Sequence, residues 1–419
     1  MLLRARIVLP MSSPPIENGV VQVAGNRIQT VGRWGQISAS PGEEVIDLGE
    51  SVLLPGLINA HCHLDYTDMA GQIARQKTFP DWIKAILALK AAWGYSDFAR
   101  SWANGAKMLL GSGVTTVLDI EAVPELLPDV WSVTPLRVIS FREIISLRKT
   151  TEREFQLTQA AAQWAALHES GDGTGRSGDR GCGLSPHAPY TTHADLLRWA
   201  VRQAESRNWL LTTHVAESQD EFDMFRHASG PMHEWLKAQR DMSDCGTLSP
   251  IQHLERCDYL SSRLIAVHAN YLEKGDTELL ARRRVHVVHC PRSHAYFGHA
   301  PFRYAGLSHA GVNICLGTDS LASVKKAGRS VSGEPLELNM FAEMRAFTST
   351  HADVPPEAIL RMVTVNPARA LNVEVGQFAP NALADMIALE YSGPVTDAAG
   401  ALVEHKPRLL KTVINGIVQ

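Results

Sequence analysis

Several histidine and acidic residues stand directly after short apolar segments of this chain. His61 and His63 end the first of these segments, and their spacing of two points both side chains to one face of a β-strand. His214 and Asp319 follow two other segments. One such histidine alone would be a hydrogen-bonded core residue, but three imidazoles and a carboxylate together suit a divalent transition metal. We therefore predict one divalent ion held by His61, His63, His214 and Asp319.

Two more polar residues could act on a water molecule at such a site. Glu217 lies three residues after His214, where its carboxyl could deliver a proton to a substrate nitrogen. His268 follows another apolar segment and could position an attacking hydroxide, while Asp319 accepts the proton of the water. The alternatives are a solvated Glu217 at a helix N-terminus and a His268 that only supports its neighbours. The pattern favours hydrolysis, with Glu217, His268 and Asp319 as catalytic residues.

The elements that must position these residues alternate between apolar runs, typical of buried parallel strands, and helical stretches. The eight runs are Leu53–Ala60, Val114–Ile120, Leu136–Phe141, Cys182–Ser185, Leu210–Thr213, Leu264–Val267, Val285–Val288 and Val312–Leu316. The helix candidates between them include Asp81–Ala92, Ala194–Arg207 and Thr277–Arg283. Eight alternations predict an α/β fold, a (β/α)8 TIM barrel with its active site at the C-terminal ends of the strands. A doubly wound open sheet is the alternative.

Both ends of the chain have β character. Two apolar segments flank a turn at residues 24–26, and Asn415-Gly416 is a favoured turn pair between two more. Because neither end can form a core alone, we predict that they pair into one small composite β-sandwich. The predicted domains are 1–54 with 373–419 for the sandwich and 55–372 for the barrel.

The charge balance excludes some classes of partner. The 419 residues carry 40 Lys and Arg against 44 Asp and Glu, a formal charge of −4, which argues against a nucleic-acid-binding surface. No run approaches the roughly 18 apolar residues of a membrane helix, and Arg4, Arg6 and Pro10 interrupt the N-terminal segment too early for a signal peptide. We expect a cytoplasmic protein acting on a small-molecule substrate, with homo-oligomerisation left open.

The motifs together resemble the amidohydrolase superfamily. The stretch Pro55–His63, the His-x-x-Glu of 214–217, His268 and the Gly-Thr-Asp-Ser of 317–320 follow the order of that superfamily. The likeness runs over essentially the whole chain and implies the barrel and the composite sandwich. The stretch 183–187 has no lysine, which resembles the mononuclear branch rather than the enzymes bridged by a carbamylated lysine.

Within that branch the chain is most similar to aminodeoxyfutalosine deaminases and S-adenosylhomocysteine/methylthioadenosine deaminases. The shared stretches are Ser185–Tyr190, His214–Ser218, Cys290–Ser293 and Gly317–Ser323. This likeness implies hydrolytic deamination of a purine-like ring, with release of ammonia. It also implies that His187 contacts the nucleoside and that Glu143 belongs to the substrate site.

The remaining expectations concern substrate and metal. His294 stands where the relatives usually have Asn and is a further candidate for substrate contact, and Arg142 and Arg148 are candidates for an anionic tail. The stretch Lys325–Pro335 resembles an insertion beside the site. Zn²⁺ is the favoured ion, and Fe²⁺ suits the same ligands.

Two alternatives to this function stay open. One is a hydrolase of the same fold that breaks another C–N or a C–Cl bond, as guanine or cytosine deaminases, chlorotriazine hydrolases and amidases do. The other is a non-catalytic binding protein.

Overall fold

A parallel β-barrel forms the larger part of the molecule. The computed structural model describes residues 1–37, 39–169, 181–324 and 336–419. The barrel strands are β6 (Leu57–Cys62), β7 (Val114–Glu121), β8 (Arg137–Ile144), β9 (Cys182–Pro186), β10 (Leu210–Val215), β11 (Leu264–His268), β12 (His286–His289) and β13 (Asn313–Leu316). Each strand pairs in parallel with the next one along the chain, from β6 to β13. The ends of the sheet meet because the backbone N–H groups of Thr318 and Asp319 donate to the carbonyl of His61 at 3.1 Å. The predicted (β/α)8 barrel is confirmed.

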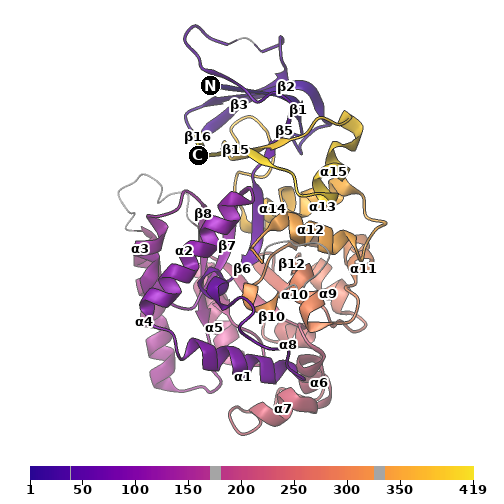
Figure 1. Ribbon diagram of the computed structural model, residues 1–419. Coiled ribbons are helices and arrows are strands. Elements are labelled where there is room, and N and C mark those ends of the chain that lie inside the picture. Colours follow the sequence, from indigo (N-terminus) through magenta and orange to yellow (C-terminus); the bar gives the residue numbers. More distant parts are fainter. Residues whose placement is uncertain (38, 170–180, 325–335) are drawn as a thin grey trace.

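Helices surround this sheet (Figure 1). They are α1 (Phe79–Lys90), α2 (Tyr95–Gly111), α3 (Leu127–Trp131), α4 (Thr151–Glu169), α5 (Ala194–Arg207), α6 (Gln219–His227), α7 (Gly230–Leu236), α8 (Pro250–Arg256), α9 (Asp276–Arg282), α10 (Pro291–Phe297), α11 (Tyr304–His309), α12 (Met340–Thr348), α13 (Pro356–Met362), α14 (Val365–Leu371) and α15 (Ala398–Glu404). Single 3-10 turns lie at η1 (Leu64–Met69), η2 (Pro124–Leu126), η4 (Leu321–Ser323) and η5 (Val395–Asp397). Because the helices cover the outside of the barrel, its strands are largely buried on both faces, and apolar residues predominate in them. In the described residues, no helix is long and apolar enough to cross a membrane.

The two ends of the chain form a second, mixed sheet at the opposite end of the molecule from α1 and α7 (Figure 1). Its strands are β1 (Leu2–Val8), β2 (Ile16–Ala24), β3 (Arg27–Arg33), β4 (Val45–Asp47), β5 (Ser51–Pro55), β14 (Met386–Glu390), β15 (Leu409–Ile414) and β16 (Ile417–Val418). Strand β14, from the C-terminal part, pairs antiparallel with β5. The predicted pairing of the two ends is therefore confirmed. Asn415 and Gly416 have φ of 51° and 72°, the left-handed values of the predicted turn.

The first predicted barrel strand was wrong in extent. The run Leu53–Ala60 divides at Gly56 between β5 of the small sheet and β6 of the barrel. At that point the chain passes so close to Thr115 that a Cβ on Gly56 would lie 2.1 Å from its Oγ1. Hydropathy could not reveal this division, because both strands are fully buried and apolar.

A buried ion pair joins the two sheets. Arg137 at the start of β8 donates from Nη2 to Oδ2 of Asp385 at 3.2 Å, and both side chains are buried. Asp385 directly precedes β14 of the small sheet. The contact between the sheets is thus partly electrostatic and out of reach of solvent.

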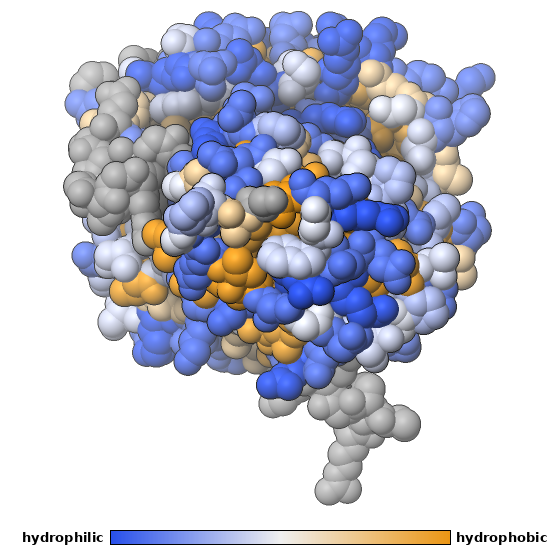
Figure 2. Space-filling view, turned by 90° about the horizontal axis from the view of Figure 1, so that it is seen from above, coloured by the Kyte–Doolittle hydropathy of each residue, from blue (hydrophilic) through white to orange (hydrophobic). Residues whose placement is uncertain are grey.

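Seen from the small-sheet end, the surface of the molecule is mostly hydrophilic, with apolar residues gathered near its middle (Figure 2).

Candidate active site

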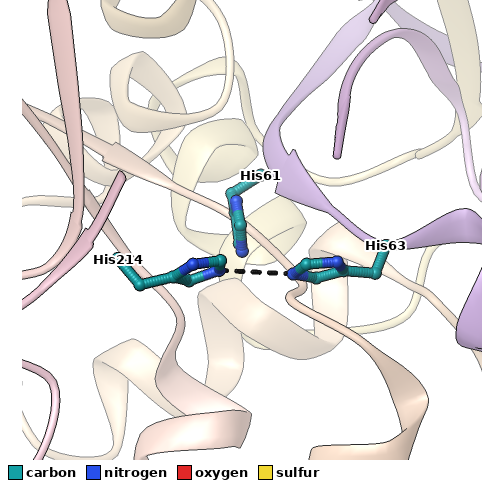
Figure 3. Close-up of side chains that lie close together, drawn as sticks. All are labelled: His61, His63 and His214. Atoms are coloured by element: carbon teal, nitrogen blue, oxygen red, sulfur yellow. Dashed lines mark hydrogen bonds between the residues drawn. The ribbon is translucent and has the colours of Figure 1, made fainter. Parts of the chain in front are cut away.

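Three histidines converge at the C-terminal end of the barrel (Figure 3). His61 lies in β6, His63 directly follows that strand, and His214 lies in β10. One ring nitrogen from each lies within 4.8 Å of the others, and the Nε2 atoms of His63 and His214 are 3.3 Å apart. Zinc–nitrogen bonds of about 2.0 Å in a tetrahedral site place two ligand nitrogens about 3.3 Å apart. His61, His63 and His214 therefore form a metal site, as the sequence predicts for these three ligands.

The protonation of the three rings also fits a metal. Burial, and then the neighbouring His61, lowers the pKa of His214 to about 4. Burial and the other imidazoles lower the pKa of His63 well below its usual range. Neutral imidazole is the form that ligates. The Nδ1 atom of His214 bonds to the carbonyl of His187 at 2.8 Å, which assigns the proton to Nδ1 and leaves the lone pair on Nε2.

Unpartnered nitrogens support the same reading. Within the described residues, both ring nitrogens of His61 and Nδ1 of His63 are buried without a hydrogen-bond partner. A buried polar atom without a partner costs about 1–3 kcal/mol. A cation bound among the rings would relieve this cost at the nitrogens that ligate it.

Asp319 lies beside the triad, directly after the turn that follows β13. Its Oδ1 is 3.7 Å from Nε2 of His61 and 3.8 Å from Nε2 of His63. Burial acts to raise the pKa of this carboxyl, but the neighbouring His61 and the other surrounding imidazoles outweigh burial and hold its pKa well below its usual range. The carboxylate is thus ionised and faces the triad, and its part in ligation stays a prediction.

Glu217 and His268 form a second group in the same place. Oε1 of Glu217 is 3.5 Å from Nε2 of His268, and both side chains are buried. Burial, followed by the nearby carboxylates of Asp319 and Glu221, raises the pKa of Glu217 well above its usual range. Burial lowers the pKa of His268 well below its usual range. Burial therefore favours the protonated form of Glu217, and His268 is neutral at neutral pH.

Sharp turns direct these side chains. Ala216, His268 and Asp319, each just after or at the end of a strand, have φ of 51°, 77° and 54°. Left-handed backbone is costly for residues other than glycine, and such strain gathers at functional sites. The loop of Glu217 is held further because its N–H donates to Oε2 of Glu221 at 2.9 Å, and Asn270 donates to its carbonyl at 3.0 Å. Glu217 is therefore not the solvated residue of the alternative interpretation.

A cavity of about 240 Å³ opens over these groups. His63, His214, Glu217, His268 and Asp319 all contribute to its wall. Much of the apolar part of the wall comes from two helices outside the barrel: Phe79, Trp82, Ile83, Ile86 and Leu87 of α1, and Trp235 and Leu236 of α7. One side of the cavity is thus polar and rich in imidazole, and the rest of the wall is largely apolar and aromatic.

Two of the predicted substrate residues line this cavity. His187 does so with Nδ1 bonded to Oγ1 of Thr191 at 2.8 Å, and burial lowers its pKa well below its usual range. Glu143 lines it from β8, and burial raises its pKa. Lys90 and Tyr66, also in the wall, were missed by sequence reasoning and carry no signal that could have found them.

Three other candidates are not among the residues that line the cavity. Arg142 precedes Glu143 on β8, where successive side chains point to opposite faces. Arg148 is exposed and donates to the carbonyls of Gln239 and Ala238 at 2.7 and 2.8 Å. Nε2 of His294 bonds to the carbonyl of Ala300 at 2.9 Å. Their substrate roles stay predictions, and the predicted insertion 325–335 lies outside the described residues.

Known proteins are similar to this chain in sequence over most of its length. A family model described as the amidohydrolase family matches residues 52–418. A 5-methylthioadenosine/S-adenosylhomocysteine deaminase of Pyrococcus furiosus is 26% identical over 387 residues, which cover 90% of this chain and 82% of the relative. A 5'-deoxyadenosine deaminase of Methanothermobacter thermautotrophicus has the same identity and coverage.

Solved structures give the same result for the fold. The aminofutalosine deaminase of Helicobacter pylori in complex with methylthio-coformycin superposes with a TM-score of 0.85 at 21% identity, covering 100% of this chain and 99% of that one. An adenosine deaminase of Xanthomonas campestris with bound zinc has a TM-score of 0.82 at 22% identity, with coverages of 100% and 92%. The atrazine chlorohydrolase TrzN of Arthrobacter aurescens complexed with zinc has a TM-score of 0.81 at 19% identity, with coverages of 100% and 94%. At these identities the likeness establishes the fold.

Proposed function

The chain belongs to the amidohydrolase family, and from that premise we propose that it hydrolyses the exocyclic amine of an adenosine-type nucleoside and releases ammonia. The nucleosides we propose are those of the aminodeoxyfutalosine, methylthioadenosine and S-adenosylhomocysteine class. The relatives named above as deaminases of methylthioadenosine, S-adenosylhomocysteine and 5'-deoxyadenosine support this choice.

The observation that carries the proposal is Glu217, a buried carboxyl with a raised pKa, in the same cavity as His63 and His214. Deamination of a purine begins by adding water across a ring C–N double bond, and the ring nitrogen must receive a proton. A carboxyl that keeps its proton at neutral pH is suited to this task. The proton that Asp319 takes from the water then goes to the leaving amine, and Glu217 recovers its own proton from the hydroxyl formed on the ring.

The residues of the triad would hold the divalent ion. When bound there, such an ion lowers the pKa of a water ligand and so supplies a nucleophile at neutral pH. We propose zinc, which is present in the related structures of Xanthomonas campestris and Arthrobacter aurescens. Iron(II) accepts the same ligands.

The other polar residues then have defined tasks. Oδ1 of Asp319 faces the triad as an ionised carboxylate and accepts the proton of the attacking water. His268 is neutral and next to Glu217, so its ring can hydrogen-bond the nucleophile and stabilise the charge that develops. His187 contributes a polar contact to the bound nucleoside.

The apolar wall supports a nucleoside with a large apolar part. Phe79, Trp82 and Trp235 offer ring faces, on which a purine or an apolar 5' substituent can stack. Aromatic stacking contributes about 0.5–1.5 kcal/mol beyond the area buried. The wall therefore favours methylthioadenosine over a free base such as cytosine.

Ammonia release tests the proposal. Zinc-loaded protein is assayed with adenosine, methylthioadenosine, S-adenosylhomocysteine, aminodeoxyfutalosine, guanine and cytosine, and chloride release is followed with a chlorotriazine. We expect ammonia from at least one adenosine-type nucleoside, and release about 10³-fold slower after Glu217→Gln. Turnover of guanine, cytosine or the chlorotriazine alone would replace the proposed substrate class, and no turnover by zinc-loaded protein would overturn it.

A further inference from the structure

The carboxylate of Asp319 is held asymmetrically. Its Oδ2 accepts hydrogen bonds from Oγ of Ser293 at 2.6 Å and from Oγ of Ser323 at 3.0 Å. Its Oδ1 is the oxygen that faces His61 and His63. The two oxygens of a carboxylate are chemically equivalent, and rotation about the Cβ–Cγ bond changes where each of them points. Contacts with neighbouring groups therefore decide the orientation of the carboxylate plane. Both serines are buried, with exposures of 1% and 0%, so water cannot readily take their place.

The two hydroxyls are not equivalent. Each has one proton to donate. The hydroxyl of Ser323 is 3.0 Å from Asp319 and 3.1 Å from the carbonyl of Ser320, so two acceptors compete for that proton. The hydroxyl of Ser293, within the described residues, has a bond to Asp319 alone, at the short distance expected of a hydroxyl donating to a carboxylate. Ser293 therefore dominates the orientation of Oδ2.

A separate part of the fold anchors Ser293. It lies in the first turn of α10, and the preceding N–H, that of Arg292, donates to Oε2 of Glu343 in α12 at 2.9 Å. The guanidinium of Arg292 also donates to the carbonyl of Glu337 at 2.9 Å. Glu343 is fully buried. The serine is thus attached to α12 and the segment before it, rather than to the turn that carries Asp319.

From this geometry we propose that Ser293 is a positioning residue, whose hydroxyl keeps Oδ1 of Asp319 directed at the histidine triad. Ser293 is not among the residues that line the cavity, so it acts through Asp319 and not through the substrate. The effect that we expect on kcat rests on the proposed function. The effect that we expect on zinc affinity rests only on the triad and Asp319.

The expected effects follow from the loss of one bond. Removing a hydrogen-bond partner of a metal ligand typically costs 10–100-fold in metal affinity or activity. We expect Ser293→Ala to weaken zinc affinity by about 10-fold and to lower kcat by about 10–100-fold, with KM changed less than about 3-fold. Ser323→Ala is the matched comparison and should lose less in both measurements, because its proton is shared.

A double-mutant cycle makes the test decisive. Zinc affinity is measured by chelator competition for the wild type, Ser293→Ala, Asp319→Asn and the double variant. We expect Ser293→Ala to cost about 10-fold in the wild-type background and less than about 2-fold beside Asp319→Asn, because the partner of the bond is then already altered. Equal costs in both backgrounds, or an unchanged zinc affinity and kcat in folded Ser293→Ala, would overturn the proposal.

Further measurements distinguish a failure of this proposal from a variant that does not fold and from a failure of the proposed function. If Ser293→Ala does not fold, Ser293→Cys is used in its place, because cysteine is similar in size and is a weak hydrogen-bond donor. The loss of zinc affinity that Ser293→Cys causes must again be smaller in the Asp319→Asn background than in the wild type. If no nucleoside is turned over, the proposed function fails while the zinc cycle still tests Ser293. If deamination and zinc affinity are both intact in the serine variants, only the positioning role fails.

Discussion

Replacing Glu217 with glutamine removes one transferable proton and leaves the surroundings of the residue unchanged. The backbone of Glu217 is held through its N–H by Glu221 and through its carbonyl by Asn270, and neither bond involves its side chain. Glutamine has the same length and carries no charge, and burial likewise favours the uncharged form of the Glu217 carboxyl. The substitution therefore isolates proton transfer from folding and from metal binding.

The size of the effect follows from this position. General acid–base catalysis contributes typically 10²–10⁴-fold to a rate. Because Glu217 is only 6% exposed, water has poor access as a substitute proton donor, so we expect the upper half of that range. A loss of about 10³-fold in kcat corresponds to about 4 kcal/mol in the barrier. KM should change less than about 5-fold, since the shape of the cavity is kept.

The assay is ammonia release at saturating nucleoside by zinc-loaded wild type and Glu217→Gln, with the exposed Glu205→Gln as a control. The pH profile adds a second readout. The acid must be protonated to act, so wild-type activity falls as pH rises through the raised pKa of Glu217, and the residual activity of the variant lacks this alkaline limb. A loss below 10-fold in kcat, or loss of zinc from the variant, would refute the reasoning.

Further predictions concern the metal and the two sheets. Removal of the ion with a chelator should abolish deamination and lower the Tm, and zinc at 100 times its Kd should restore about 2.7 kcal/mol of stability, measured by thermal unfolding with and without zinc. Arg137→Ala removes one partner of the buried ion pair and should lower the free energy of unfolding, measured with urea, by about 3–5 kcal/mol. Arg137→Met combined with Asp385→Leu replaces both partners and should recover most of this loss, so equal losses in the two variants would contradict the prediction. Burial raises the pKa of Glu343 from its usual value near 4.5 to about 8, so its contribution to stability is complete below about pH 4.5 and is lost as pH rises through about 8. Glu343→Gln should therefore flatten the fall in stability between pH 5 and about 8, and an unchanged slope in urea unfolding would exclude this role.

The parts of the site that the sequence predicts are those set by local geometry. His61 and His63 share a face because of the strand repeat, and His214 joins them because parallel strands end at one rim. The division at Gly56 escaped prediction because two buried strands of different sheets are equally apolar. No local pattern marks the change of partner.

The cavity wall depends on contacts between distant segments. Trp82 and Trp235 stand in amphipathic or short helices, and nothing in their spacing distinguishes a residue that faces the cavity from one that faces the core. The same holds for His294 and Arg148, which come within five residues of the end of a barrel strand. Their side chains instead bond to nearby backbone carbonyls.

The pairing of the chain ends also has a consequence for synthesis. Strand β5 is completely buried, and one of its neighbours is β14, which is made more than 300 residues later. Domains generally fold as units during translation, from the N-terminus onward at about 5–20 residues per second. At that speed one edge of β5 stays unpaired for at least about 15 seconds during synthesis, until β14 has been made. Strand β5 leads directly into β6, at the end of which His61 and His63 lie. Strand β6, the first part of the metal site to be synthesised, is therefore joined to the small sheet, which is complete only when the C-terminal strands have been made.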